Sequence, residues 1–449
     1  MTDASEHPSP PSAAAILARD FNWRIVVFSA TLLLVLITLQ PFIDRSAIAT
    51  ISVGSLDTTY PIIELLLLAA SLVLCVPLVR VALPSLVRTF SVLLILWLVV
   101  AVATSQNVDL SFRRLLVALL EIGLAAAVLL VPKTLEEFSG ALIAAVAGVL
   151  VLCYLSVLIV PNLTIHQMTD ALEPELDGNW RGLYFHKNTA GMMMGIFVFV
   201  GLFAIRMEWR MVGAFIIGAA LPFLLLTRSK NAIALLVLVY AVAAAAQRVK
   251  SWRWRALICV LPLILLNVFT VGTVFFEPLK HFVDLLGIDS TFTGRSDIWS
   301  FVTDRIKERP ITGYGLRAFW NTSAAFAAGE HDQDWLWRAG SSHNAYLDLA
   351  LTIGIPGTVL MTIVVVIYPL VDYQRRLREP ANELLAGLFF PIWLFLLYST
   401  ALESLFLDRS PTWFMLVFSI FGLRYLSVFR VNSASRQPAV TAGGTAARR

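Results

Sequence analysis

Twelve apolar blocks dominate this sequence and constrain its fold more than any other feature. Each approaches the length of about 20 residues that a helix needs to cross a bilayer. Only 14% of the 449 residues are charged, against roughly 25% in soluble domains. We therefore expect an all-α, polytopic membrane protein with about 12 transmembrane helices, centred within residues 25–41, 61–79, 89–104, 115–131, 139–160, 189–205, 211–227, 231–247, 256–275, 345–369, 383–400 and 412–429.

Basic residues in the short connections predict the orientation of the chain. They gather in the connections that share a side with both termini, for example at Arg80, Arg88, Arg248, Lys250, Arg375 and Arg376. Short loops rich in Lys and Arg stay on the cytoplasmic side. Residues 161–188 and one long, partly helical loop, 276–343, are thus predicted to face the outer side.

The two ends of the chain are polar and differ from the region between them. Residues 1–24 start with the Pro- and Ser-rich MTDASEHPSPPSAAA, and residues 431–449 have the same character. Segments this poor in large apolar residues cannot bury enough surface to fold alone. Both are predicted to be disordered cytoplasmic tails, because the first lacks the pattern of a cleaved signal peptide. The transmembrane domain is predicted to span residues 25–430.

One helix is clearly signalled within the long loop, by TFTGRSDIWSFVTDRIKERP. Thr293 or Ser296 can cap its start, and Pro310 can end it. Arg295 lies at its N-terminus, where free backbone N–H groups and a guanidinium form a seat suited to a diphosphate. The helix is predicted to lie along the membrane surface, because one face carries Ile298, Phe301, Val302 and Ile306.

His343 stands where the long loop returns to the membrane, in SSHNAYLDLALTIGIPG. A neutral imidazole near water can take a proton from a hydroxyl at neutral pH. Cations on the same side, at Arg181, Lys187, Lys230 and Arg295, could stabilise a diphosphate leaving group. This pattern suits transfer of a sugar from a lipid diphosphate. The alternative is that His343 caps a helix at the interface and the cations only fix spans at the lipid headgroups.

Several other polar residues are candidates for functional sites. The acidic segment GEHDQDW, with Glu330 to Asp334, contains an Asp-x-Asp pattern, but a solvated loop is the favoured interpretation and no metal site is predicted. Glu64 and Glu121 fall inside spans, where carboxylates are often functional. We expect Glu64 to reach solvent and Glu121 to be a buried, protonated packing residue. The net charge of +4 gives no reason to expect a nucleic-acid partner.

The segment after the long loop resembles a known family. His343-Asn344, nine residues and then Gly354-Ile-Pro-Gly357 is similar to the His-Asn-x9-Gly-x2-Gly signature of the O-antigen ligase/O-antigen polymerase superfamily of bacterial membrane glycosyltransferases. TGRSDIW around Arg295 and ITGYGLRAFW at 311–320 resemble two other shared blocks. RGLYFHKNTAG and LLLTRSKNAIALL look closer to its exopolysaccharide-polymerase branch, since ligases more often carry an arginine at the place of Lys230.

The resemblance implies an inverting transfer that needs neither metal nor cofactor. The donor would be an undecaprenyl diphosphate-linked oligosaccharide and the acceptor a sugar hydroxyl, at the periplasmic side of the bacterial inner membrane. It implies that His343 is the catalytic base and that Arg181 and Arg295 hold the diphosphate, with Lys187 and Lys230 as electrostatic support. The implied partners are the lipid-linked donor, the glycan acceptor and the bilayer, with a chain-length regulator or export complex as a further candidate.

Three functions are compatible with these features. The leading one is polymerisation of exopolysaccharide or O-antigen repeats. The second is ligation of a finished glycan to lipid A core or to a protein. The third, a polysaccharide transporter, is disfavoured because the polar residues gather at one face instead of the bilayer midplane.

Overall fold

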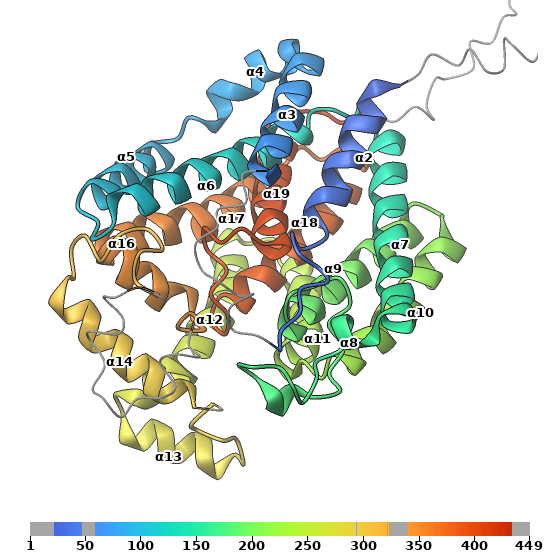
Figure 1. The fold of residues 1–449 in the computed structure, drawn as a ribbon. Helices are drawn as coiled ribbons and strands as arrows, with labels where there is room; N and C mark the ends of the chain where they lie inside the picture. The colour runs from blue at the N-terminus through green and yellow to red at the C-terminus, as the bar shows by residue number, and fades with distance from the viewer. Residues whose placement is uncertain (1–21, 47–58, 293, 321, 323–339, 433–449) are drawn as a thin grey trace, which may run out of the picture.

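The computed structural model describes residues 22–46, 59–292, 294–320, 322 and 340–432 (Figure 1). Within these ranges the chain is all-α, with one isolated β-bridge between Ile165 and Trp180. The predicted tails, except for their inner edges, lie outside the described residues, and so does the acidic segment from Glu330 to Asp334. The all-α, polytopic fold class is confirmed.

Every predicted apolar block contains a helix. In chain order these are α2 (Trp23–Val35), α3 (Thr59–Leu74) with α4 (Val76–Leu86), α5 (Thr89–Ala103), α6 (Val108–Val128), α7 (Leu135–Ile159), α9 (Lys187–Arg206), α10 (Arg210–Leu226), α11 (Lys230–Arg248), α12 (Trp252–Phe269), α16 (Ala345–Thr362) continued by η5 (Ile363–Ile367) and α17 (Tyr368–Arg375), α18 (Pro380–Ser399) and α19 (Pro411–Leu426). The connections carry shorter elements, namely α8 (Pro161–Thr164), η2 (Pro174–Leu176), η3 (Val271–Val274), α13 (Glu277–Leu285) and α14 (Arg295–Glu308).

Six helices in the described part of the chain are long and apolar enough to cross a membrane, and the bent pair α3 and α4 would make a seventh. Four shorter apolar helices, α2, α5, α10 and α19, accompany them. Helix α6 carries Arg113, Arg114 and Glu121 within its apolar sequence and is not among these candidate spans. The number of about 12 spans therefore stays a prediction.

The second apolar block is broken, although the sequence predicted one continuous helix over 61–79. Helices α3 and α4 meet at an angle of 105°. Pro77 lies in the first turn of α4 and has no N–H to continue the hydrogen bonds of α3. The Arg24 guanidinium instead binds the carbonyl of Leu74 at the end of α3, and it also binds the carbonyl of Val131 at 3.0 Å. The carbonyl left free at the break is therefore bound by the side chain of Arg24.

Two deeply buried helices, α9 and α18, form the middle of the bundle (Figure 1). They approach closely because Gly195 of α9 faces the ring of Phe395 in α18, where an added Cβ would lie 2.6 Å from the ring. Helix α9 begins at Lys187 and α18 ends at Ser399. These two ends lie together, because Asn188 in the first turn of α9 donates a hydrogen bond to Glu403, which follows the end of α18. These two buried helices therefore carry the candidate site.

Helix α14 differs from its prediction in two respects. Gly294, with φ of +82°, occupies the N-cap position, so Ser296 lies inside the helix and does not cap it; Thr293 is outside the described residues. The apolar face does not lie on the membrane surface, because protein covers it: Phe301 and Val302 are buried in a cluster with Tyr314, Phe319, Trp320 and Leu351. Helix α14 ends at Glu308, shortly before Pro310, as predicted.

Helix α16 is interrupted at Gly354, where φ is +71° and ψ is 174°. A Cβ at this position would collide with the carbonyl of Ile311, and a positive φ also favours glycine. The segment 310–315 docks onto this break through three backbone hydrogen bonds, Tyr314 N–H to Leu351 O (2.9 Å), Gly315 N–H to Thr352 O (2.9 Å) and Ile355 N–H to Pro310 O (2.8 Å). The GIPG and ITGYG motifs thus form one structural unit.

Candidate functional site

Glu403 is the centre of the candidate site. It lies in the connection between α18 and α19, and its side chain is 14% exposed. Its Oε2 is 3.2 Å from Nδ1 of His343. Its Oε1 accepts hydrogen bonds from Nη2 of Arg295 at 3.0 Å and from Nδ2 of Asn188 at 2.7 Å. One carboxylate therefore joins two of the predicted site residues.

Four helices begin around this carboxylate. Asn188 is in the first turn of α9, Arg295 starts α14 and His343 directly precedes the N-cap of α16. Ser229, the N-cap of α11, donates a hydrogen bond of 3.2 Å to Oδ1 of Asn188. A helix N-terminus carries a partial positive charge and free N–H groups. This end of the bundle is consequently suited to an anion.

Asn344 holds His343 in place. Residue His343 has a positive φ of 51°, so the chain turns sharply just before α16. Asn344 is fully buried, and its Oδ1 caps α16 by accepting hydrogen bonds from the N–H groups of Tyr346 (3.0 Å) and Leu347 (3.1 Å). Its Nδ2 donates to two neighbouring segments, at Asn267 Oδ1 (2.9 Å) and Ala401 O (3.0 Å). The His343 side chain remains 31% exposed, which leaves it open to a substrate.

The contacts of Glu403 fix the tautomer of His343. Burial alone would raise the pKa of Glu403, but the Arg295 charge and the hydrogen bond from His343 hold this pKa at about 2. An ionised carboxylate only accepts hydrogen bonds. Nδ1 of His343 must then carry the proton, and the lone pair lies on Nε2. Many hydrolytic and transfer enzymes use such a pair, in which a carboxylate orients the imidazole that acts as the base.

Arg295 spans two acceptors at the site. Its Nη1 donates to the carbonyl of Leu402 at 2.7 Å, and its Nη2 donates to Glu403. A guanidinium has five N–H donors, so further donors remain for a ligand. The side chain is 16% exposed. Arg295 is therefore placed both to hold Glu403 and to meet an incoming anion.

Lys187 and Lys230 lie at the starts of α9 and α11. Lys187 is half-buried, and Lys230 is exposed. Lys187 is within electrostatic range of Lys230, Arg228 and Glu403. The two predicted lysines thus belong to the same charged region as the Glu403 network, and Arg228 adds a further cation to it.

Arg181 lies apart from this network. Its side chain is buried, and its guanidinium donates to three backbone carbonyls, those of Pro41 (3.3 Å), Ile43 (3.1 Å) and Tyr184 (3.0 Å). Burial, together with the nearby charge of Arg45, lowers the pKa of Arg181 to about 10, so the group stays charged at neutral pH. In this structure Arg181 fastens residues 181–184 to the segment that follows α2 and makes no contact with Glu403, Arg295 or His343.

Sequence reasoning did not identify Glu403 or Asn188. A usable signal was present, because the predicted topology places the connection 400–411 on the same outer side as the cations. A carboxylate in that connection is a natural partner for an uncompensated arginine and for a histidine base. The connection carries no recognisable motif that would single out Glu403.

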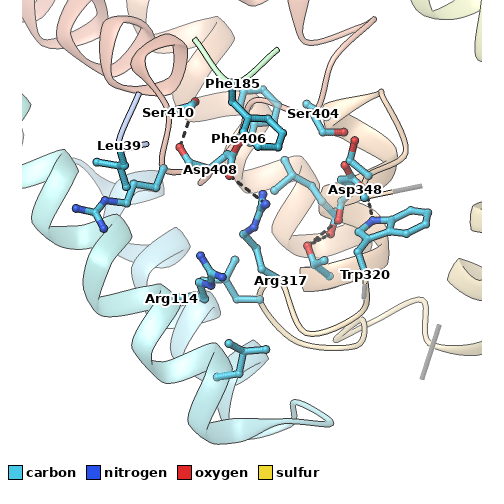
Figure 2. Close-up of a pocket in the computed structure, with 18 of the residues that line it drawn as sticks. Leu39, Arg114, Phe185, Arg317, Trp320, Asp348, Ser404, Phe406, Asp408 and Ser410 are labelled. Carbon is cyan, nitrogen blue, oxygen red and sulfur yellow. Dashed lines mark hydrogen bonds and ion pairs between the residues drawn. The ribbon is translucent and has the colours of Figure 1, made fainter. Parts of the chain in front are cut away.

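A cavity of about 770 Å³ lies beside the network (Figure 2). Ser341 and Ala345, on either side of His343 in the sequence, line it, and so does Ser404, which follows Glu403. Arg409 also lines this cavity.

Glu64 is not solvated, contrary to the expectation from sequence. It is buried with Arg409, whose Nη2 lies 2.9 Å from its Oε1. Glu121 is buried as expected, and its Oε1 lies 3.9 Å from Nε of the same arginine. Both acidic residues thus belong to one arginine-centred cluster behind the cavity.

Comparison with known proteins finds one family and one curated relative that resemble this chain. A family model described as O-Antigen ligase matches residues 213–362, a stretch that contains Lys230, Arg295 and His343. Over this stretch the chain is similar to the O-antigen ligase/polymerase superfamily. It is also 26% identical over 232 residues to the Exopolysaccharide production protein ExoQ of Rhizobium meliloti (strain 1021). That match covers 47% of this chain and 52% of the relative, so it spans about half of the relative's length.

The superfamily match stops short of part of the site. Asn188 and Glu403 lie outside residues 213–362, and so does Arg181. The structure nevertheless joins Glu403 to Arg295 and His343 of the matched stretch through direct hydrogen bonds. Asn188 is connected to them through its own hydrogen bond to Glu403. The complete network could therefore be assembled only from the fold.

Proposed function

We propose that this protein is a membrane glycosyltransferase that joins lipid diphosphate-linked glycan repeats. The observation that carries the proposal is the hydrogen-bonded unit of His343, Glu403 and Arg295. It combines a base held in one orientation with a positively charged site that can bind an anion, at the N-termini of several helices. Both are required when a sugar hydroxyl displaces a diphosphate.

The transfer is a single displacement. Nε2 of His343 takes the proton of the acceptor hydroxyl, and the hydroxyl oxygen attacks the anomeric carbon of the donor sugar. The bond between that carbon and the diphosphate oxygen breaks, and its electron pair leaves with the diphosphate. The products are a new glycosidic bond of inverted configuration, the lipid diphosphate and a protonated His343, whose charge Glu403 stabilises.

The negative charge that develops on the diphosphate is met by cations from three elements. Arg295 starts α14, Lys187 starts α9 and Lys230 starts α11, and the helix N-termini add their partial positive charges. Arg181 contributes indirectly in this proposal. Its three carbonyl contacts fix the loop that leads into Lys187.

Polymerisation of repeats is the favoured form of this reaction. The matched relative is named for exopolysaccharide production, and the chain has Lys230 where ligases more often have arginine. The donor is proposed to be an undecaprenyl diphosphate-linked oligosaccharide and the acceptor another repeat, at the periplasmic side of the bacterial inner membrane. Ligation of a finished glycan to lipid A core remains the second candidate, since the O-Antigen ligase model also matches.

Deletion of the gene followed by analysis of the surface and lipid-linked glycans tests the proposal. A polymerase predicts single repeats on the lipid carrier and no long polymer. Accumulation of long lipid-linked polymer would indicate a ligase instead. Unchanged polymer length and attachment in the deletion strain would overturn both forms of the proposal.

Replacing Arg295 by lysine is expected to fail almost as completely as replacing it by alanine. The two Nη atoms of Arg295 bind different acceptors, and an ammonium group cannot reproduce this fork. We expect transfer to fall by about 10²–10³-fold in both variants, measured as polymer formed per membrane-inserted protein. Arg305→Lys on the same helix, where the arginine pairs with Glu308, is the matched control. Activity of Arg295→Lys close to wild type would show that charge alone matters.

Removal of divalent metals is expected to leave transfer intact. Protein cations and helix N-termini supply the charge stabilisation that Mg²⁺ provides in other transferases. The measurement is the rate of polymer formation by purified protein before and after dialysis against EDTA. A clear loss that Mg²⁺ or Mn²⁺ restores would point to the acidic segment Glu330–Asp334 as a metal site.

A further inference from the structure

We propose that the cavity beside the His343–Glu403–Arg295 network binds a sugar that carries a carboxylate, and that Arg114 recognises this group. The inference rests on the proposed function and deepens it, because it names the class of glycan that the enzyme accepts. Four features of the cavity support it: the chemistry of its walls, the arrangement of its arginines, the charge of the ligand group that these arginines fit, and the position of the cavity next to the base.

The walls of the cavity suit a sugar ring. Aromatic side chains line it, among them Tyr60, Phe185 and Trp320, together with hydroxyl and carboxylate groups such as Ser341, Ser404 and Asp348. Flat aromatic faces pack on the apolar face of a sugar while polar groups bind its hydroxyls. A volume of about 770 Å³ can hold more than one sugar residue.

Three arginines line the same cavity, and two of them have partners. Arg317 pairs with Asp408 at 3.0 Å, and Arg409 pairs with Glu64 at 2.9 Å. Figure 2 shows Arg317 extended toward Asp408, with Arg114 rising from α6 toward Arg317. Carboxylates of the protein thus neutralise these two arginines, which form part of the cavity wall.

Arg114 is different. No ion pair involves it among the residues that the structure describes, and its buried Nε has no hydrogen-bond partner there. Among its charged neighbours, Arg317 and Arg409 repel its charge, and Asp408, which attracts it, is already paired with Arg317. A partly buried guanidinium in this position is costly unless a ligand supplies an anion. Among the described residues, Arg114 therefore brings to the cavity a positive charge that no ion pair neutralises.

One uncompensated guanidinium matches a single carboxylate. A planar carboxylate can accept two parallel hydrogen bonds from arginine. A diphosphate carries more charge, and its proposed seat at Arg295, Lys187 and Lys230 lies at other helix starts. The walls suited to a sugar, together with one arginine that has no ion pair among the described residues, favour an acidic sugar over the lipid diphosphate in this cavity.

The cavity is also in the correct place for a substrate glycan. Ser341 and Ala345 bracket His343 in the sequence, and Ser404 follows Glu403. Thr189, another lining residue, follows Asn188. A glycan in the cavity would consequently lie against the same backbone segments that position the base. Arg114 would then determine specificity for repeats that carry a carboxylate near His343.

Binding of two matched disaccharides to the full-length protein in lipid nanodiscs tests the inference. The probes are cellobiouronic acid, which carries one carboxylate, and cellobiose, which carries none. We expect the acidic probe to bind at least about 10-fold more tightly, which corresponds to about 1.4 kcal/mol. In Arg114→Gln this preference should fall to nearly equal binding. Equal binding of the two probes to the wild-type protein would overturn the inference.

Arg113→Gln is the matched control. Arg113 is the neighbouring residue in α6, its side chain is 55% exposed, and it pairs with Asp109. This variant should keep the preference for the acidic probe, and loss of the preference here would show that bulk charge, not the cavity, is responsible. Persistence of the preference in Arg114→Gln would also contradict the inference.

Two further arms separate this inference from its alternatives. His343→Ala should bind both probes as the wild-type protein does, so failed transfer and failed recognition can be told apart. Inorganic pyrophosphate should not displace cellobiouronic acid. Displacement that depends on Arg114 would make the cavity the diphosphate seat and refute the assignment of an acidic sugar.

Discussion

Replacing His343 by alanine is expected to abolish glycan elongation while the protein still folds and inserts. The loss of a positioned base costs roughly 10²–10⁴-fold in rate. The variant should remain folded because Asn344, not His343, supplies the cap of α16 and the bonds to Asn267 and Ala401. The measurement is polymer formed by a deletion strain that expresses the variant, normalised to its amount in the membrane.

His281→Ala is the control for this variant. His281 is an exposed histidine of α13, in the same long loop, and has no place in the proposed site. It should support normal polymer. Normal polymer from His343→Ala at wild-type abundance would refute the assignment of His343 as the base.

Replacing Glu403 by glutamine is expected to reduce transfer by about 10²–10⁴-fold. Glutamine can present an N–H to Nδ1 of His343, which would move the proton to Nε2 and remove the base from the face that meets the acceptor. Arg295 would also lose its charged partner. The substitution changes one atom, so the fold should persist, and the rate loss should appear in kcat more than in KM.

A pH profile distinguishes this positioning role from a purely structural one. The low pKa of Glu403, about 2, means that it stays ionised throughout the working range and does not itself shape the profile. Its charge stabilises the protonated imidazole. Residual activity of Glu403→Gln should therefore persist to lower pH than that of the wild-type protein. Glu208→Gln, at an exposed glutamate, is the control. An unmoved acid limb would contradict the orienting role of Glu403.

Helix positions could be predicted well from sequence because the bilayer sets the length of apolar blocks. Each of the twelve blocks contains a helix. The errors arose where tertiary contacts compete with that rule. Arg24 and Pro77 break the second block, and the segment 314–320 together with Leu351 of α16 covers the apolar face of α14. A hydrophobic pattern predicts that a face is buried, but it does not distinguish lipid from protein as the covering surface.

The candidate site could be predicted only in part, for a related reason. Arg295 and His343 carry local motifs, and the structure joins them through Glu403. Arg181 has an equally suggestive motif, but its charge is used on backbone carbonyls of a distant segment. Partners 60 to 215 residues away along the chain, such as those of Glu403, leave no periodic signal in the sequence. The fold alone decides which arginine is free to meet a ligand.

The most direct test is reconstitution of the purified full-length protein with an undecaprenyl diphosphate-linked repeat as the sole substrate. The quantities to measure are the new glycosidic bonds and the free undecaprenyl diphosphate. The account predicts elongated glycan, with one lipid diphosphate released for each bond formed, and neither product from His343→Ala. Movement of the lipid-linked repeat across the bilayer without release of the lipid diphosphate would contradict it and indicate a transporter.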